Sequence, residues 1–441
     1  MKRLLSLLLC VVLALFCAPT AQAAGVSITL TASEYALHYA FDAGAQDPFV
    51  ILEYTTPAEK GWMMLYSEDG HFEGDVSLAY SGAGGKTSVA LTSARTTGSI
   101  GKASTTLPKA ADYQKPTGKS NAKVTDFVLT ETPEGFHYAF NAAGTDYMLL
   151  YWRSKEQTVT QPVYPDENGH YEGDVISDLT FARTQFTVQV KSGSGSMKKE
   201  ATVRKGYQAP EAPQRQEGRL SGVTVCIDAG HQENGRFVKE PIGPGLTGST
   251  SGKGGMAQGT KTNRRESIVC LEIGMLLRDE LLRQGANVIM TREDQTTFHT
   301  NIERCEIAEA GGAQIMLRLH CNNSSNHSKR GIQVYGPLNS DYAKAVADAD
   351  TYREMGQKLL DAMKTRVGMT LAKSTGMVRL NDNYVGNNWA KMMCFLVEMG
   401  YLSNPAEEYL LVTPVYQQWL AEGMADGVYE IAVARGWVQA Q

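Results

Sequence analysis

The sequence predicts a multidomain protein: two immunoglobulin-like β-sandwich repeats, followed by an α/β domain with a mixed sheet and helices on both faces. Residues 26–210 contain an internal duplication of strand-like segments. After residue 220 the pattern changes, and short apolar runs alternate with amphipathic helical segments. The length of 441 residues accommodates such an arrangement.

The duplication appears as two pairs of matching segments. Residues 38–42 recur at 137–141, and residues 69–76 recur at 168–175, both with an offset of 99 residues. Strand-like alternation and frequent turn signals in units of this length are typical of a β-sandwich. Histidines recur with the repeat and are expected to contribute to its packing; they are His38, His71, His137 and His170. Calcium binding by nearby acids is a weaker alternative to solvated hairpin ends; these acids are Glu73, Asp75, Glu172 and Asp174.

Residues 1–23 have the pattern of a secretory signal peptide. Lys2 and Arg3 precede an apolar run, and small residues at 21–23 fit a cleavage site. A retained membrane anchor is the alternative. No later apolar stretch is long enough to span a membrane, so we expect an exported, soluble mature protein.

Charge and cysteine content exclude further classes of protein. The net charge of −5 argues against a nucleic-acid partner. Two of the seven cysteines leave with the signal peptide, and the other five show no disulfide spacing, so at least one thiol should be free. The remaining cysteines are Cys226, Cys270, Cys305, Cys321 and Cys394.

The expected division of the chain follows from these patterns. It comprises a signal peptide at 1–23, repeats at 24–115 and 122–208, a polar linker at 209–219 and the α/β domain at 220–441. Within that domain, strands are expected at 223–228, 286–291, 314–320, 331–335 and 394–398. Helices are expected at 266–284, 302–310, 350–367 and 409–436.

Four residues at the ends of these elements carry the functional prediction. His231, His320 and Glu398 follow or end strands, and Glu266 begins a helix. A hydrolytic zinc ion needs about three nitrogen or oxygen ligands, an open position for water and a nearby carboxylate. Two histidines and two glutamates supply such a set.

Each of these residues also has a structural explanation. Glu266 could complete a capping box with Asn263, and His320 could be a core histidine with satisfied hydrogen bonds. Glu398 is harder to explain in this way, because an acid that ends a buried apolar strand is costly unless it is paired. Glu233 and Glu240 are weaker alternatives to Glu266. His299 and His327 match no ligand position.

Taken in order along the chain, these residues reveal a resemblance. Residues 220–436 resemble the catalytic domain of the zinc-dependent N-acetylmuramoyl-L-alanine amidases, the cell-wall hydrolases of the type 3 amidase family. The matching pieces are 228–231, Glu266, 291–292, Arg304, 319–322 and 397–404.

The resemblance implies one Zn²⁺ per catalytic domain, bound by His231, Glu266 and His320, with Glu398 as the catalytic carboxylate. It implies cleavage of the amide between N-acetylmuramic acid and L-alanine in peptidoglycan, by a secreted, cell-wall-associated enzyme. The two repeats would act as spacers or bind a wall or surface ligand.

Other assignments rest on single residues or segments. Asn322, Arg292 and Asn388 are candidate substrate-groove or supporting residues. Cys321 stands where the family usually has alanine, but it directly follows His320 and should point away from the metal. The long segment 232–265 could form a wall of the groove or a mobile surface loop.

Two functional alternatives remain open from sequence. One is a zinc peptidase that cuts within the stem peptide, because the same metal chemistry suits any amide. The other is a non-catalytic cell-wall-binding protein with a vestigial site.

Overall fold

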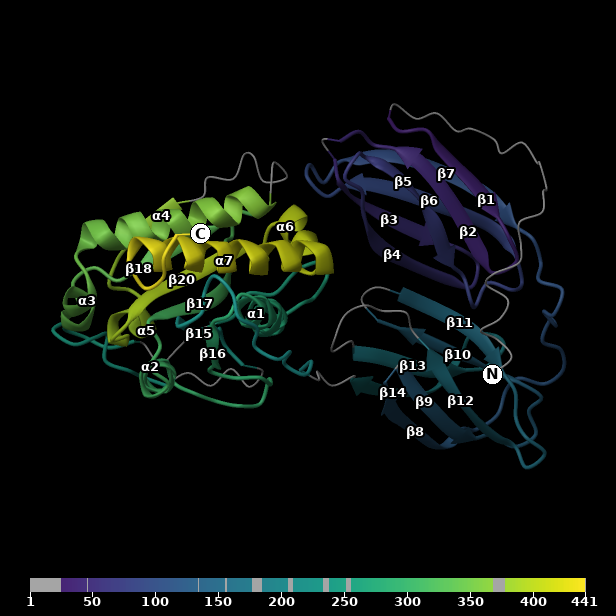
Figure 1. Ribbon diagram of the computed structural model, residues 1–441. Coiled ribbons are helices and arrows are strands. Elements are labelled where there is room, and N and C mark those ends of the chain that lie inside the picture. Colours follow the sequence, from purple (N-terminus) through teal and green to yellow (C-terminus); the bar gives the residue numbers. More distant parts are fainter. Residues whose placement is uncertain are drawn as a thin grey trace.

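The computed structural model describes residues 25–45, 47–133, 135–154, 157–176, 185–204, 209–232, 238–250, 255–367 and 377–440. Figure 1 shows a strand-rich N-terminal part beside a C-terminal part in which helices cover a sheet. The predicted signal peptide at 1–23 lies outside the described residues. No helix in the described ranges is long and apolar enough to cross a membrane.

The first repeat contains seven strands in two sheets. One sheet has the order β1-β2-β5 and the other contains β4-β3-β6-β7. The strands are β1 (Ile28–Ala32), β2 (Ala36–Asp42), β3 (Phe49–Thr55), β4 (Glu59–Tyr66), β5 (His71–Ser77), β6 (Gly85–Ser93) and β7 (Ser99–Leu107). Alternate apolar side chains of both sheets form one core, which includes Leu37, Phe41, Leu52 and Leu91.

The second repeat has the same arrangement. Its sheets are β12-β9-β8 and β11-β10-β13-β14, and an antiparallel pairing of β4 with β11 joins the larger sheets of both repeats into one. The strands are β8 (Thr125–Thr132), β9 (Gly135–Asn141), β10 (Met148–Arg153), β11 (Gln157–Val163), β12 (His170–Ile176), β13 (Gln185–Lys191) and β14 (Met197–Arg204). The prediction of two immunoglobulin-like sandwiches is confirmed.

The recurring histidines lie on the solvent face of the three-stranded sheets, so the prediction that they serve packing was wrong. His38 and His71 pair with Asp75 and Asp42 at 3.1 and 2.7 Å. His137 pairs with Asp174 at 2.9 Å in the second repeat. Alternation along a strand explains this placement, because the flanking aromatic residues occupy the inward positions.

The C-terminal part is built on a mixed six-stranded sheet with the order β16-β15-β17-β20-β18-β19. Its strands are β15 (Thr224–Ala229), β16 (Asn287–Met290), β17 (Ile315–Asn322), β18 (Gln333–Gly336), β19 (Met377–Leu380) and β20 (Met393–Tyr401). Its helices are α1 (Glu266–Arg283), α2 (Asn301–Ala310), α3 (Asp341–Val346), α4 (Ala349–Val367), α5 (Val385–Trp389), α6 (Pro405–Leu411) and α7 (Pro414–Ala434). All strands are parallel to their neighbours except at the β18–β20 pairing.

Helices cover both faces of this sheet, as predicted. Val225, Leu317 and Phe395 point into a core that also contains side chains of α1, α4 and α7. The adjacent residues Cys226 and Met316 point to the opposite face and cluster with α2 and α5 residues. In Figure 1, α4 and α7 lie along one side of the sheet and α2 and α5 on the other.

Some predicted elements differ from the structure. The helix expected at 409–436 is two helices, because Pro414 cannot continue α6 and instead begins α7. The expected linker at 209–219 packs on the C-terminal end of α1, where the Arg215 guanidinium donates to the carbonyl of Gly285. β19, α3 and α5 were not predicted.

The first repeat packs directly against α6 and α7. The rings of Phe49 and Trp419 lie 5.6 Å apart, and those of Trp62 and Tyr409 lie 5.0 Å apart, both edge-on. Phe49 belongs to the same buried cluster as Tyr416. This contact holds α6 in position, and α6 in turn supports two loops at the edge of the C-terminal sheet.

Two neighbouring acids on α6 hold those loops. Glu407 accepts hydrogen bonds from the backbone amides of Gly331 and Tyr401, at 2.8 and 2.7 Å. Glu408 accepts from the amide of Lys261, at 3.0 Å, in the segment that leads to α1. Burial raises the pKa of Glu407 to about 7, although the two amides act in the opposite direction.

A buried ion network ties the strand ends to α2. Asp228, at the end of β15, pairs with Arg304 of α2 and with Arg318 of β17, the latter at 2.8 Å. The Thr291 hydroxyl donates to the same carboxylate at 2.8 Å. Burial alone would raise the pKa of Asp228, but the two guanidinium groups outweigh it and hold the pKa far below its usual range.

Replacing Asp228 with Asn should therefore lower the free energy of unfolding by about 3–5 kcal/mol, because two buried arginines lose their counter-charge. Urea denaturation measures the change. The matched control is Asp350→Asn, which removes an exposed pair with Arg353 and should cost less than about 1 kcal/mol. Equal losses of unfolding free energy in the two variants would contradict the prediction that the buried network stabilises the fold.

Glu407 should make stability depend on pH. Its folded-state pKa of about 7 exceeds the ordinary 4.5, so its stabilising contribution is complete below pH 4.5 and is lost as pH rises through 7. Relative to Glu407→Gln, the wild type should lose stability between pH 5 and 7, by at most about 1.4 kcal/mol per pH unit. Urea denaturation at several pH values tests this, and a difference that is constant from pH 5 to 8 would refute it.

Candidate functional site

The turn after β15 brings His231 to the carboxyl edge of the sheet. His231 has a left-handed backbone with φ of 59°, a conformation that costs energy for a residue with a side chain. A Cβ on Gly230 would lie 2.5 Å from the carbonyl oxygen of Leu319 and 2.6 Å from the His320 ring. Only glycine therefore lets this turn approach the end of β17.

Arg292 holds this turn from behind. Its guanidinium donates to the carbonyls of Ala229, Gly230 and Ser267 at 2.7–2.9 Å. Its side chain is buried and lines none of the cavities described below. Burial lowers its pKa to about 10. The prediction of Arg292 as a supporting residue fits this position, whereas contact with substrate does not.

Glu266 occupies the centre of the site. One carboxylate oxygen lies 3.1 Å from Nε2 of His231 and 2.9 Å from Nδ1 of His320, and it accepts the amide of Cys321 at 3.1 Å. The other oxygen accepts the amide of Ala257 at 2.7 Å. Burial disfavours its charge, yet the two histidines outweigh burial and lower its pKa well below 4.5. The capping alternative is wrong, because α1 begins after Arg265 without a side-chain cap.

The three side chains form a group that could hold a metal ion. One donor atom from each of His231, Glu266 and His320 lies within 4.8 Å of the others. Nε2 of His320 is buried without a hydrogen-bond partner, and burial lowers the pKa of this imidazole, which favours its neutral, ligating form. Cys321 points away, as predicted, toward Cys270. All five cysteines of the described residues are free and buried.

Glu398 lies one strand away from His320. The two residues are register partners in the parallel pairing of β17 with β20, so their side chains share one face of the sheet. Oε2 of Glu398 is buried without a hydrogen-bond partner. Burial, and then the charge of Glu266, raise the pKa of Glu398 well above 4.5. An unpaired buried carboxyl group beside three potential metal ligands is suited to proton transfer.

The described part of the long loop, 238–250, is anchored to the sheet and its helices. Glu240 accepts the Asn301 side-chain amide at 2.7 Å and the backbone amide of Ile302 at 2.9 Å, at the start of α2. The buried Asn388 amide donates to the carbonyl of Ile242 at 3.1 Å. Glu240 therefore caps a helix and does not join the histidines, and Asn388 holds the loop. Glu233 lies outside the described residues.

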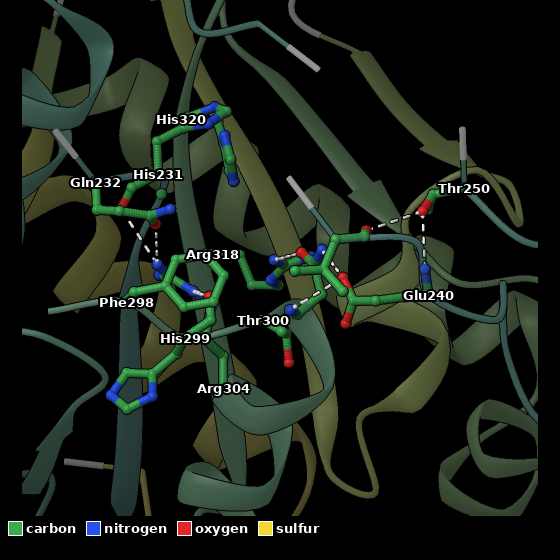
Figure 2. A pocket seen from close by; sticks show the side chains of 13 residues that line it. His231, Gln232, Glu240, Thr250, Phe298, His299, Thr300, Arg304, Arg318 and His320 are labelled. Carbon is green, nitrogen blue, oxygen red and sulfur yellow. Dashed lines mark hydrogen bonds between the residues drawn. The ribbon is translucent and has the colours of Figure 1, made fainter. Parts of the chain in front are cut away.

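Two cavities meet at the histidines of the three-residue group. Figure 2 shows His231 and His320 at one end of the first cavity and Glu240 with Thr250 at the other. A second cavity contains Glu266, His320 and Glu398, together with Asn322. Asn322 therefore fits its predicted place in the groove. His299 lines the first cavity, and His327 bonds to the carbonyl of Ser403.

Sequence reasoning missed Arg318 and Tyr384. Arg318 carries one end of the buried network and lines both cavities, and Tyr384 lines the second. A charged residue in the middle of an apolar strand was the available signal for Arg318. Tyr384 precedes the unpredicted helix α5 and had no such signal.

Comparison with known proteins supports one family. Residues 225–430 match the family model described as N-acetylmuramoyl-L-alanine amidase. The chain is 25% identical over 230 residues to the germination-specific N-acetylmuramoyl-L-alanine amidase of Bacillus subtilis, covering 49% of this chain and 83% of that protein. It is 26% identical over 218 residues to the probable cell wall amidase LytH of Staphylococcus aureus, covering 48% of this chain and 60% of LytH.

Solved structures match over about half of the chain. An N-acetylmuramoyl-L-alanine amidase from Clostridium difficile 630 is 24% identical with a TM-score of 0.38, over 48% of this chain and 96% of that one. Ami1 of Mycobacterium abscessus is 19% identical with a TM-score of 0.41, over 48% and 99%. Residues 225–430 of this chain are therefore similar to the N-acetylmuramoyl-L-alanine amidases.

Proposed function

We propose that the chain is a zinc-dependent hydrolase that cleaves the amide between N-acetylmuramic acid and the L-alanine of the peptidoglycan stem peptide. The observation that carries this proposal is the juxtaposition of His231, Glu266 and His320 with the unpaired carboxyl group of Glu398. The family match names the bond to be cut. The donor set of two imidazoles and one carboxylate suits zinc.

The residues present fit one zinc ion. His231, Glu266 and His320 would hold it, and the backbone amides of Ala257 and Cys321 would orient the Glu266 carboxylate. When bound, zinc polarises a carbonyl group and makes a bound water more acidic. The deprotonated state of Glu266 and the lowered pKa of His320 both prepare the site for a cation.

Glu398 is the proposed general base and acid. Its free Oε2 would take a proton from the attacking water as the water oxygen bonds to the lactyl carbonyl carbon. The same group would then deliver the proton to the alanine nitrogen as the C–N bond breaks. Its raised pKa favours this second step, because a weaker acid holds the proton until the amine needs it.

The remaining parts of the proposal concern location and the repeats. A signal-like sequence at 1–23, together with a wall polymer as substrate, supports export and cell-wall association. The two β-sandwiches would act as a support or as a module for a wall or surface ligand, and the packing of Trp62 on Tyr409 favours support.

Glu398→Gln should lower kcat by about 10²–10⁴-fold, because the amide cannot accept the proton. Mass spectrometry of purified peptidoglycan digested with zinc-loaded protein provides the assay. The wild type should release stem peptides that begin at L-alanine and leave peptide-free glycan. The control Glu306→Gln changes an exposed acid on α2 and should retain full activity. Cuts within the stem would instead indicate a peptidase, and an active Glu398→Gln variant would refute the assigned role.

His320→Ala should abolish stoichiometric zinc binding, because only two of three ligands remain. Elemental analysis of dialysed protein should give about one zinc per wild-type chain and far less for the variant. Chelation should abolish wild-type activity, and added zinc should restore it. The control His299→Ala alters a nearby histidine outside the three-residue group. Equal zinc content in His320→Ala and wild type would contradict this ligand set.

A further inference from the structure

A third hollow continues from the proposed catalytic site toward the sheet edge. Its lining shares Asn322 and Asn323 with the cavity that contains Glu398. It has a volume of about 490 Å³. Its other lining residues come from the segment before β18 and from β18, β19 and β20: Ser328, Lys329, Arg330, Gln333, Tyr335, Met377, Arg379 and Tyr401.

Strand register determines how this hollow is aligned with the site. Gln333 of β18 is the register partner of Glu398, and Met377 of β19 is the partner of Gln333. Arg379 likewise lies opposite Tyr335. Neighbouring strands are about 4.8 Å apart, so β19 lies roughly 10 Å from Glu398. An extended peptide covers that distance in about three residues.

The floor of the hollow is polar but neutral. The Asn322 amide donates to Oε1 of Gln333 at 3.1 Å, and the Gln333 amide donates to the Tyr401 hydroxyl at 3.1 Å. The Tyr335 hydroxyl donates to Oε1 of Gln333 at 2.5 Å. Two acids approach this floor from outside: Glu398 is the register partner of Gln333, and Glu407 accepts the amide of Tyr401. Neither of these acids lines the hollow.

The rim of the hollow is cationic. Lys329 and Arg379 are exposed and Arg330 is half-buried. No acidic side chain lines the hollow, and none of these three cations has an ion pair with another described residue. The cavity lined by Glu240 and Thr250 differs, because its arginines, Arg304 and Arg318, both form ion pairs with Asp228. Arginine and lysine side chains without an ion pair among the described residues therefore line this hollow and not that cavity.

We propose that this hollow binds a carboxylate of the stem peptide, within about three residues of the scissile amide, through Arg379 and Lys329. The inference rests on the proposed amidase function. It adds the orientation of the substrate, with its peptide on one side of Glu398 and its glycan on the other. The peptide extends over β18 and β19, and the uncharged glycan lies toward Thr250 and α2. Guanidinium and ammonium groups around a neutral polar floor suit a carboxylate.

The test compares two muramoyl peptides that differ at one group. One carries a free carboxylate on its second residue, and in the other that carboxylate is an amide. The zinc-loaded wild type should show a kcat/KM on the order of 10-fold higher for the free acid. In Arg379→Gln and in the Lys329→Gln, Arg379→Gln double variant, this ratio should fall toward 1.

The matched control is Lys364→Gln, which removes an exposed lysine of α4 outside the hollow and should retain the wild-type ratio. Thermal unfolding of each variant verifies that the fold is intact. Cleavage of both substrates with no preference, or a preference that survives in the double variant, would overturn the assignment of the hollow. Failure of the wild type to cleave either substrate would instead refute the proposed amidase function, and the inference that depends on it.

Discussion

A single buried carboxylate, that of Asp228, connects the elements on which the site is built. It receives guanidinium groups from α2 and β17 and a hydroxyl group from Thr291, which follows β16. Three residues that follow Asp228 by 63, 76 and 90 positions therefore meet near the end of β15, two residues before Gly230. An ion group of this kind is costly to assemble and very costly to break, so it specifies one arrangement of strand ends.

Strand periodicity then determines where the proposed catalytic groups lie. Asp228 shares a face of the sheet with Arg318, His320 and Glu398, because alternate residues on aligned strands point the same way. Glu266 enters from the first turn of α1 and joins the two histidines through one oxygen. The site is thus placed by sheet register and by helix position, and loops contribute mainly its walls.

The first β repeat also supports the elements around the site. Its aromatic residues pack on α6 and α7, and α6 in turn holds the segments around Lys261 and Gly331 through Glu408 and Glu407. One of these segments leads to Glu266 and the other to β18. The first repeat therefore contacts the C-terminal domain at α6, which supports both the proposed zinc ligands and the proposed peptide-binding hollow.

Much of this arrangement was readable from sequence, and the exceptions have physical reasons. Nearly continuous apolar runs with polar ends identified the strands of His231, His320 and Glu398, because both faces of the sheet are buried. β19 was missed because it is four residues long and only partly buried. Arg292 and Asn388 resembled groove residues, yet both are buried and bind backbone carbonyls. Sequence shows a polar side chain but not whether it faces a ligand or the chain itself.

The central claim is that His231, Glu266 and His320 bind one zinc ion beside Glu398. Anomalous diffraction at the zinc edge from crystals of the zinc-loaded protein tests it most directly. The account predicts one strong peak per chain, about 2.0–2.2 Å from a nitrogen of each histidine and an oxygen of Glu266. A peak at another group of side chains, or a sulfur ligand from Cys321 at about 2.3 Å, would contradict it.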